Sequence, residues 1–432
     1  MCYAIPAKLI SIDGQTGTID YFGEKRKILL DLNDLKTGDY VYAQGGVLVR
    51  KIPKKDALEI LDHWKDIFFE LKKTDAALAK IDQSKLSPNA LAVLQKINLR
   101  KSLTKKEMLA LLELKDPQEL KVLYEIANNV RQREHGNASC VHGIIEFSNH
   151  CHNNCYYCGI RNERDLPRYR MSIKEIITAA KDAVNKHGFK ALVLQSGEDL
   201  WYDDAKLTTI VKAIRKMGVL VFVSLGSRSK KTYRKLYDAG ARAALMRFET
   251  SNKDIFAKLR PGTNLDDRIE LIKYLKEIGY VLATGFIIGL PEETYEDIVN
   301  NILLAKYLAP DMYSFGPLLP ASDTPLSNMF ETDIPEQFVN LVLKTIAVAR
   351  FVDSGSNILV TTALETLDKN AKKEALLAGA NSMMINITPA KYRQLYAIYD
   401  NKADLEKEIT QSIQETVELL YKLGRAPTDI GV

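Results

Sequence analysis

Three cysteines stand close together in a chain that is otherwise poor in cysteine. Cys151, Cys155 and Cys158 follow the spacing C-x3-C-x2-C directly after a β-like run over 143–147, and the chain has five cysteines in all. An odd number of thiols joined by such short loops does not suit an intramolecular disulfide framework. We therefore predict that the three thiolates bind metal.

Two kinds of metal centre are compatible with this spacing. Three thiolates hold three irons of a 4Fe-4S cube and leave the fourth iron open to a small chelating molecule, whereas a closed cluster takes four cysteines. The alternative is a zinc site that adds His152 or another histidine to the three thiolates. The polar residues that follow in the chain favour the cluster.

The elements that must position these thiols alternate between strand-like and helical patterns. Glycines at 188, 218, 240, 279 and 379 end predicted helices, one of which begins at the capping box Ser172–Glu175. Parallel strands separated by helices, eight in number, predict a (βα)8 barrel, an α/β fold whose chemistry takes place at the carboxyl ends of the strands. The eight predicted strands are 143–147, 191–195, 219–225, 243–248, 281–288, 312–315, 358–362 and 382–387.

Polar residues stand at the ends of several predicted strands. Gln195 to Asp199 follow the second strand, and the carboxylate of Glu198 can accept a hydrogen bond from a ligand ammonium. Glu249, after the fourth strand, can accept both hydroxyls of a ribose, and Arg268 can pair with a ligand carboxylate. Taken singly, each charged residue is more often a salt-bridged barrel residue. Together at successive strand ends they predict a binding site.

The cysteine spacing, with Tyr157 before the last cysteine, resembles the signature of the radical S-adenosylmethionine (SAM) enzymes. Ser196-Gly197-Glu198 resembles the element with which that family binds the methionyl amine, and 285–292 fits its G-x-I-x-G-x-x-E element. The resemblance implies one 4Fe-4S cluster, whose open iron is chelated by SAM, and reductive cleavage of SAM to a 5'-deoxyadenosyl radical. The cofactor-binding residues that it implies are Tyr157, Gln195, Ser196, Gly197, Glu198, Glu249, Arg268 and Ile287.

A narrower resemblance covers roughly residues 93 to 427. The runs that carry it are similar to HydE, the radical SAM maturase family of iron-iron hydrogenase, more than to biotin synthase or methylornithine synthase. This resemblance implies a large barrel cavity and a cysteine-ligated iron substrate that carries carbon monoxide and cyanide. The runs are 144–149, 158–161, 168–171, 193–199, 258–261 and 392–396. The cavity residues implied are Arg247, Thr361, Thr362, Met384 and Tyr396, although strand packing also explains the two threonines.

Two positions depart from the family pattern. Phe248 stands where the family usually has histidine in an R-H-E-T run, which changes a polar group beside the SAM site. No cysteine follows Cys158, so the set that binds a second cluster in some members is missing. The sequence therefore predicts a single cluster.

The first 53 residues have a different character. Five short strand-like runs at close spacing predict a small, OB-like β-barrel. The segments 1–6 and 38–46 resemble HypC, a family of small hydrogenase chaperones. That resemblance implies that Cys2 becomes the N-terminus and helps to hold an iron fragment, while Gln44 replaces the family's histidine. A barrel that only docks a partner or its own catalytic domain is the alternative. The runs are 8–12, 17–22, 26–32, 39–44 and 47–52.

We thus expect a HypC-like barrel over 1–53, a helical linker over 54–92 and a HydE-like radical SAM barrel with a helical N-terminal extension over 93–432. The net charge of +5 is mild, and no apolar run is long enough to span a membrane. We therefore expect a cytoplasmic protein without nucleic-acid or membrane partners. The expected partners are a reductase or ferredoxin-type electron donor and a hydrogenase or maturation protein.

Two other functions are compatible with the sequence. The first keeps the radical chemistry but acts on a small organic thiol, a thiazolidine or an amino acid. The second makes the chain a non-catalytic carrier or scaffold for an iron fragment, although a complete SAM site is hard to explain in a pure carrier.

Overall fold

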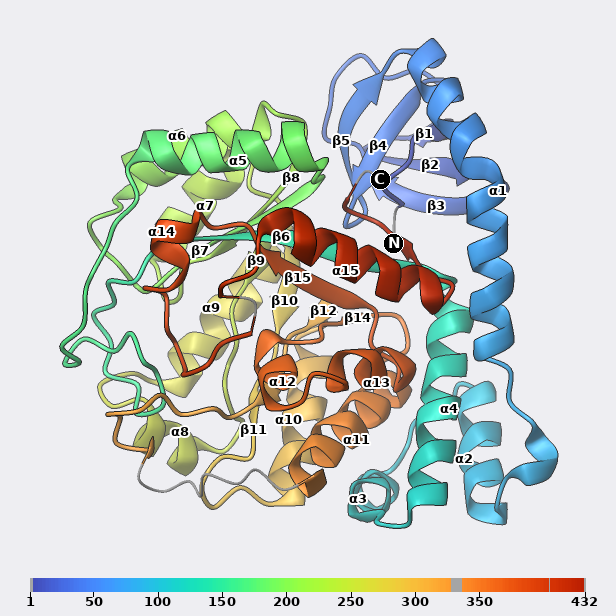
Figure 1. The fold of residues 1–432 in the computed structure, drawn as a ribbon, viewed down its shortest axis with the longest axis vertical. Helices are drawn as coiled ribbons and strands as arrows, with labels where there is room; N and C mark the ends of the chain where they lie inside the picture. The colour runs from blue at the N-terminus through green and yellow to red at the C-terminus, as the bar shows by residue number, and fades with distance from the viewer. Residues whose placement is uncertain (1–2, 328–335, 404, 431–432) are drawn as a thin grey trace.

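The computed structural model describes residues 3–327, 336–403 and 405–430. Figure 1 shows a small β-barrel at one corner, a long helix that runs down from it, and a large α/β barrel that occupies the rest of the molecule. The expected α/β class and the two barrels are confirmed. Within the described residues, no helix has the length and apolar character needed to cross a membrane.

The N-terminal barrel closes in the order β1-β2-β3-β5-β4. More buried and less buried residues alternate in β2 and β3, whereas β4 is buried along most of its length; Leu9, Ile19, Val41 and Leu48 fill the interior. The predicted five-stranded barrel is therefore present. Its strands are β1 (Ala7–Asp13), β2 (Thr16–Tyr21), β3 (Glu24–Leu29), β4 (Tyr40–Gln44) and β5 (Val47–Ile52).

A helical segment connects the two barrels, as the apolar spacing predicts. The longest helix lays Trp64, Phe68 and Leu71 against the core of the small barrel. The next helix contributes Leu94 and Ile97 to the core of the large barrel, so it crosses the boundary expected at residue 92. The segment comprises α1 (Lys54–Leu78), η1 (Gln83–Lys85), α2 (Pro88–Asn98), α3 (Lys105–Glu113) and α4 (Pro117–His135).

A buried ion pair joins α1 to α4. The carboxylate of Asp75 accepts hydrogen bonds from both terminal nitrogens of Arg131, at 2.7 and 2.8 Å, and lies 3.7 Å from Nε of Arg425. Asp75→Asn is expected to lower the free energy of unfolding by about 3–5 kcal/mol, because it leaves buried guanidinium charge uncompensated. Urea denaturation measures this effect.

The matched control for this prediction is Asp182→Asn. Asp182 forms an exposed ion pair with Lys186 at 3.1 Å, one helical turn away. Such pairs contribute at most about 1 kcal/mol, so the control should lose little stability. If the two variants lost the same small amount, the buried pair would not be holding α1 in place.

The large barrel has eight parallel strands in chain order around the ring. The strand order runs β14-β12-β10-β9-β8-β7-β6-β15, and a bridge between Leu359 and Ser382 joins the two ends. The predicted (βα)8 architecture is therefore confirmed. The strands are β6 (Ala138–Ser148), β7 (Ala191–Ser196), β8 (Leu220–Ser224), β9 (Ala243–Leu245), β10 (Val281–Thr284), β12 (Met312–Tyr313), β14 (Asn357–Ile358) and β15 (Ser382–Asn386), with β16 (Ala426–Pro427) beside β6.

Helices cover the outside of this barrel (Figure 1). The capping box at Ser172 and Glu175 is present, and Gly188 ends the same helix in the left-handed conformation that glycine adopts without steric cost. The helices are α5 (Ile173–His187), α6 (Asp204–Arg215), α7 (Lys230–Asp238), α8 (Lys253–Leu259), α9 (Leu265–Glu277), α10 (Tyr295–Tyr307), α11 (Glu336–Val352), α12 (Thr362–Leu367), α13 (Ala371–Leu377), α14 (Ala390–Arg393) and α15 (Ile409–Lys422).

Several predicted strands differ from the observed strands in their boundaries; the strand expected over 243–248, for example, ends at Leu245. The strand expected over 281–288 is split at Gly285, where a Cβ atom would come within 2.2 Å of the Ser314 carbonyl oxygen; its second part is β11 (Ile287–Ile288), which pairs with β13 (Gly316–Pro317). The strand expected over 358–362 ends at Ile358, because Thr361 and Thr362 begin α12. The alternative explanation of these threonines by strand packing is thereby wrong.

The small barrel docks against the amino-terminal end of the large barrel. Its outer face, including Tyr42, Val47 and Val49, packs against residues at the starts of the barrel strands, such as Ala191 and Leu220. The turn between β4 and β5 approaches so closely that a Cβ on Gly45 would lie 3.0 Å from the Leu220 side chain. This end of the barrel is therefore closed by the small domain.

Candidate functional site

A cavity of about 320 Å³ opens inside the large barrel. It collects residues from the ends of nearly all the barrel strands, as expected for this fold. Sixteen of the seventeen predicted site residues line it; the seventeenth, Cys2, lies outside the described residues. The sixteen are Cys151, Cys155, Tyr157, Cys158, Gln195, Ser196, Gly197, Glu198, Arg247, Glu249, Arg268, Ile287, Thr361, Thr362, Met384 and Tyr396.

The cysteine loop is held by backbone contacts rather than by regular secondary structure. The amide of Tyr156 donates to the Leu259 carbonyl at 2.9 Å, and the amide of Gly159 donates to the Ile398 carbonyl at 2.9 Å. Gly159 is required there, because a Cβ would come within 2.1 Å of the Ala397 carbonyl oxygen. The loop is thus fixed between α8 and the chain that precedes α15.

The three thiols form a donor set that fits an iron-sulfur cluster better than a single zinc ion. Among the residues that the structure describes, they are not one of the groups whose ligand atoms all lie within 4.8 Å of one another. A tetrahedral zinc ion with Zn–S bonds of about 2.3 Å would place its sulfurs about 3.8 Å apart. His152 is half-exposed, and its Nδ1 lies 2.7 Å from the Glu198 backbone oxygen. The wider thiol spacing and this contact both disfavour the zinc alternative.

Burial raises the pKa of the thiols of Cys155 and Cys158. A thiol in such an apolar surrounding is a poor thiolate unless positive charge compensates it. Bound iron supplies that charge, because a metal ion deprotonates the thiols that coordinate it. These residues therefore fit the cluster that the spacing predicts.

Two carboxylates and two guanidiniums interlock beside the cysteine loop. Arg268 places its terminal nitrogens 3.7 Å from Glu198 and 3.6 Å from Glu249. Arg260 does the same at 3.6 and 3.8 Å. All four side chains are at most 10% exposed. Burial alone would raise the pKa of Glu198, but Arg268 and then Arg260 outweigh it and hold that pKa below its ordinary value.

The backbone around this charged group is shaped by close approaches. Glu249 adopts a positive φ of 71°, a conformation that a residue with a side chain keeps only where the surrounding structure imposes it. Gly226 faces Glu198 so closely that a Cβ would lie 2.2 Å from its Cγ. Glu198 and Glu249 are thus held in fixed positions at the cavity.

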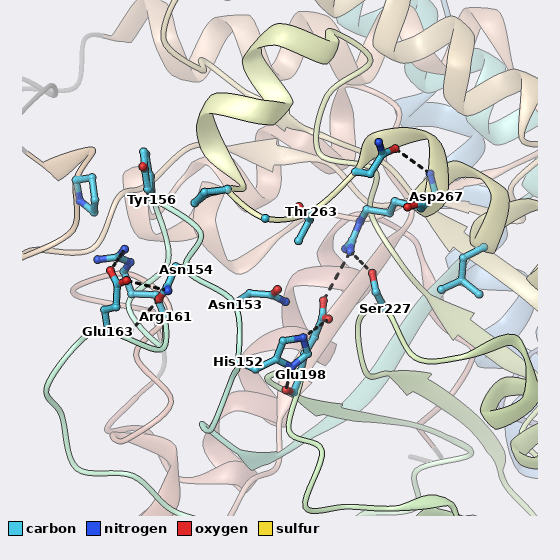
Figure 2. A pocket seen from close by; sticks show the side chains of 16 residues that line it. His152, Asn153, Asn154, Tyr156, Arg161, Glu163, Glu198, Ser227, Thr263 and Asp267 are labelled. Atoms are coloured by element: carbon cyan, nitrogen blue, oxygen red, sulfur yellow. Dashed lines mark hydrogen bonds and ion pairs between the residues drawn. The ribbon is translucent and has the colours of Figure 1, made fainter.

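A second, more open hollow of about 1060 Å³ adjoins the cavity on the outer side of the cysteine loop. Asn153, Glu198 and Arg268 line both spaces. The Arg268 guanidinium donates to the Ser227 hydroxyl at 2.9 Å and lies 3.7 Å from Glu198, and Figure 2 shows Ser227 and Glu198 on the same side of this hollow. The charged group therefore stands between the barrel interior and the outer surface.

The wall of the cavity carries a second set of polar groups. Arg247 donates to the Ser314 hydroxyl at 3.2 Å, and the buried hydroxyl of Thr361 has no hydrogen-bond partner among the residues that the structure describes. Glu146 forms an ion pair with Lys402 and accepts from Asn386 at 2.8 Å. An unpaired buried hydroxyl and a desolvated ion pair at a cavity wall are groups that a bound molecule can satisfy.

Sequence reasoning missed Arg260, Glu146, Asn386 and Lys402 as site residues. A charged residue inside the apolar run of the first strand was the available signal for Glu146. Phe248, by contrast, is fully buried against Phe286, with ring centroids 5.9 Å apart, so it does not line the cavity. Phe248, which stands where the HydE family usually has histidine, therefore belongs to the apolar core and adds no polar group to the cavity wall.

Comparisons with known proteins agree with this site. Residues 145–305 match the model of the Radical SAM superfamily, residues 1–64 match the HupF/HypC family, and residues 314–426 match the Biotin and Thiamin Synthesis associated domain. The solved structure of methylornithine synthase (PylB) is 26% identical, with a TM-score of 0.69, and the match covers 78% of this chain and 97% of that one. The maturase HydG, 19% identical with a TM-score of 0.65 over 84% of this chain and 78% of that one, shares the fold.

The barrel, the cysteine loop and the family match together define a radical SAM enzyme. The HydE subunit of the FeFe-hydrogenase maturase from Thermotoga maritima is 38% identical over 336 residues, which cover 78% of this chain and 94% of that protein. The 3-methylornithine synthase of Methanosarcina acetivorans is 28% identical over 74% of this chain and 89% of that protein. The chain belongs to the HydE family and carries an added N-terminal HupF/HypC domain.

Proposed function

We propose that this enzyme cleaves SAM reductively and acts on a small cysteine-ligated iron complex, bearing carbon monoxide and cyanide, during assembly of a hydrogenase metallocofactor. The observation that supports this most is that the wall of one cavity combines the three thiols, the charged group and the second set of polar residues. The 38% identity to a HydE maturase subunit supports the pathway.

In this proposal Cys151, Cys155 and Cys158 hold one 4Fe-4S cluster through three of its irons. When bound, the cluster supplies the electron that cleaves the sulfonium of SAM. Glu198 accepts hydrogen bonds from the methionyl ammonium, and Arg268 pairs with the methionyl carboxylate. Both roles require the side chains to exchange their mutual contacts of 3.7 Å for contacts with the ligand.

We assign the remaining contacts with SAM to residues that line the same cavity. Glu249 accepts from the ribose hydroxyls, while Ile287 lies at the wall as an apolar surface for adenine. Tyr157, Gln195, Ser196 and Gly197 complete the wall around the same ligand. The side chains thereby exclude water from the reacting carbon, which prevents side reactions of a radical.

In this proposal the substrate occupies the part of the cavity that is lined by the predicted cavity residues. Arg247 supplies a cation, Thr361 and Thr362 supply hydroxyls for an anion such as cyanide, and Met384 and Tyr396 form an adaptable wall. Cys2 of the N-terminal domain helps to hold the iron fragment before or after the reaction. A ferredoxin-type donor or reductase supplies electrons, and a hydrogenase or another maturation protein receives the product.

A single cluster is the expected metal content of the cysteine loop. Anaerobic reconstitution with iron and sulfide should give about four irons per chain, since three thiolates at one site hold one cube. Elemental analysis together with acid-labile sulfide measures this. A value near eight irons would contradict the single-cluster proposal.

The buried Lys402 ammonium is expected to act on the substrate rather than on SAM. Lys402→Met should lower substrate-dependent turnover by about 10–100-fold, because a charge-assisted contact contributes about 1.5–3 kcal/mol. Formation of 5'-deoxyadenosine without substrate should change by less than about threefold. The control Lys391→Met removes an exposed ion pair with Glu175 at 2.7 Å and should leave both rates alone. A parallel fall of both rates in Lys402→Met would instead indicate a structural role.

A second candidate substrate is a small amino acid or organic thiol. The likeness to methylornithine synthases favours it, as does the Glu146–Lys402 pair, which offers opposite charges to a zwitterion. Mass spectrometry of products from matched incubations with amino acids and with the iron complex separates the two candidates. Turnover of an amino acid alone would overturn the iron-complex proposal.

A further inference from the structure

Three buried side chains face one another near the amino-terminal end of the large barrel. Cys140 and His142 come from β6, and Asp429 follows β16. Their ligand atoms, a thiol sulfur, an imidazole nitrogen and a carboxylate oxygen, all lie within 4.8 Å of one another. The three residues are 6%, 4% and 1% exposed, respectively. None of them is needed by the chemistry proposed for the cavity.

The strand geometry brings Cys140 and His142 to the inside of the barrel. Alternate residues of a strand point to the same face, and Ile144 and Glu146 of β6 line the cavity. His142 and Cys140 therefore face the same interior, and they lie one and two alternate positions, respectively, nearer to the small domain than Ile144. The imidazole of His142 lies against Phe222, with ring centroids 5.1 Å apart, which fixes its plane.

Asp429 is held in place by its own hydrogen bonds. Its Oδ2 accepts from the Val141 amide at 2.9 Å and from the Thr428 hydroxyl at 2.8 Å, while β16 pairs with β6. Hydrogen bonds that orient a carboxylate in this way are the usual support for metal ligands in proteins. The carboxylate thus reaches the imidazole in a fixed orientation.

The contact between His142 and Asp429 is close but badly aligned for a hydrogen bond. Nδ1 of His142 lies 3.1 Å from Oδ2 of Asp429, yet this nitrogen has no hydrogen-bond partner within the described residues. A tetrahedral zinc ion separates its nitrogen and oxygen ligands by about 3.3 Å. The distance of 3.1 Å between Nδ1 of His142 and Oδ2 of Asp429 is close to that between two ligands of one zinc ion. The poor alignment for a hydrogen bond is compatible with both atoms pointing toward a shared metal ion instead of toward each other.

We propose that Cys140, His142 and Asp429 bind one zinc ion at a site distinct from the cluster cysteines. Sulfur, nitrogen and oxygen together are a donor set that zinc takes, and three protein ligands leave the fourth position to water. The site adjoins the docked domain, because the Lys190 amide donates to the Asp429 carbonyl at 2.6 Å and its ammonium lies 4.8 Å from the centre of the Tyr42 ring. The ion links β6 to the C-terminal segment at this junction.

The first test measures zinc on the full-length protein with its cluster reconstituted, after removal of loosely bound metal and equilibrium dialysis against zinc chloride. About one zinc ion per chain is expected. Cys140→Ser should weaken zinc binding by at least about tenfold, whereas Ser139→Ala, on the opposite face of β6, should retain it. Equal zinc content in both variants would overturn the proposal.

A second test does not depend on the folding of Cys140→Ser. In the full-length chain with the three cluster cysteines changed to serine, only Cys2 and Cys140 remain as thiols. Addition of cobalt(II) should give a thiolate-to-cobalt charge-transfer band at one equivalent, and the band should persist when Cys2→Ser is added. Absence of the band, or its loss with Cys2→Ser, would show that the three residues form only a buried structural contact.

Discussion

Cys151→Ser is expected to abolish formation of 5'-deoxyadenosine from SAM. The thiol of Cys151 is one of only three in the cysteine loop, and serine offers an oxygen that iron in a cluster binds poorly. We expect a loss on the order of 10³-fold or more, because residues that act as one unit fail together. Anaerobic incubation with SAM and a strong reductant, followed by chromatography, measures the product.

The matched control is Asn154→Ser, a substitution in the same loop that removes no thiol. Asn154 donates to Glu163 at 3.1 Å on the outer side of the loop. This variant should assemble its cluster and form 5'-deoxyadenosine at close to the wild-type rate. If Cys151→Ser retained the activity of this control, the three cysteines would not be the ligands of the reactive cluster.

Glu198→Gln is expected to weaken SAM binding by about 10–100-fold. The substitution keeps the shape of the side chain but removes the charge that receives the methionyl ammonium, and charge-assisted hydrogen bonds contribute about 1.5–3 kcal/mol. It also leaves Arg260 and Arg268 with Glu249 as their remaining carboxylate partner in this group. Equilibrium dialysis of the reconstituted protein with labelled SAM measures the affinity.

The control variant Glu163→Gln removes one negative charge from the outer hollow, which Glu198 also lines. Glu163 lines the outer hollow, is 63% exposed and pairs with Arg161 at 2.8 Å (Figure 2). Its neutralisation should change SAM affinity by less than about twofold, because exposed ion pairs contribute little. An unchanged SAM affinity in Glu198→Gln would remove Glu198 from the binding site.

Most of the site was predictable because the fold imposes a rule on position. Once the alternation of strands and helices indicates a (βα)8 barrel, the residues after each strand must meet at one end. That rule places Glu198, after β7, and Glu249, after β9, within reach of the same Arg268 guanidinium, although they stand 51 positions apart in the chain. Local patterns could also place the capping box at Ser172 and the glycine that ends its helix.

Other features depend on contacts that no local pattern encodes. Lys402 lies in an irregular segment, and its partner Glu146 is 256 positions away. Thr361 and Thr362 were expected at the end of a strand because threonine favours strands, but β14 ends at Ile358 and α12 begins at Thr362, with Thr361 as its N-cap. Gln44, which stands in place of the histidine of the HypC family, is completely buried, and its side-chain amide has no hydrogen-bond partner among the described residues. Burial and tertiary packing decide such positions.

The docking of the small domain is a further consequence that the sequence alone did not settle. Tyr42 and Val47 share one apolar cluster with residues at the amino-terminal ends of the barrel strands. The HypC-like domain therefore packs directly against the catalytic barrel. This contact agrees with the alternative expectation that the small barrel docks its own catalytic domain. The cavity lies toward the other end of the same strands, so the two halves of the chain meet along the barrel axis.

The most direct test of the account compares 5'-deoxyadenosine formation by the reconstituted wild-type enzyme with and without a cysteine-ligated iron carbonyl cyanide complex. SAM and reductant are present in both incubations, and the iron complex is followed by infrared spectroscopy. The complex is expected to stimulate 5'-deoxyadenosine formation, and its carbonyl and cyanide bands are expected to change in step with that product. The proposed function would be contradicted if a protein with a filled cluster formed no 5'-deoxyadenosine, or if the iron complex left the rate of its formation unchanged.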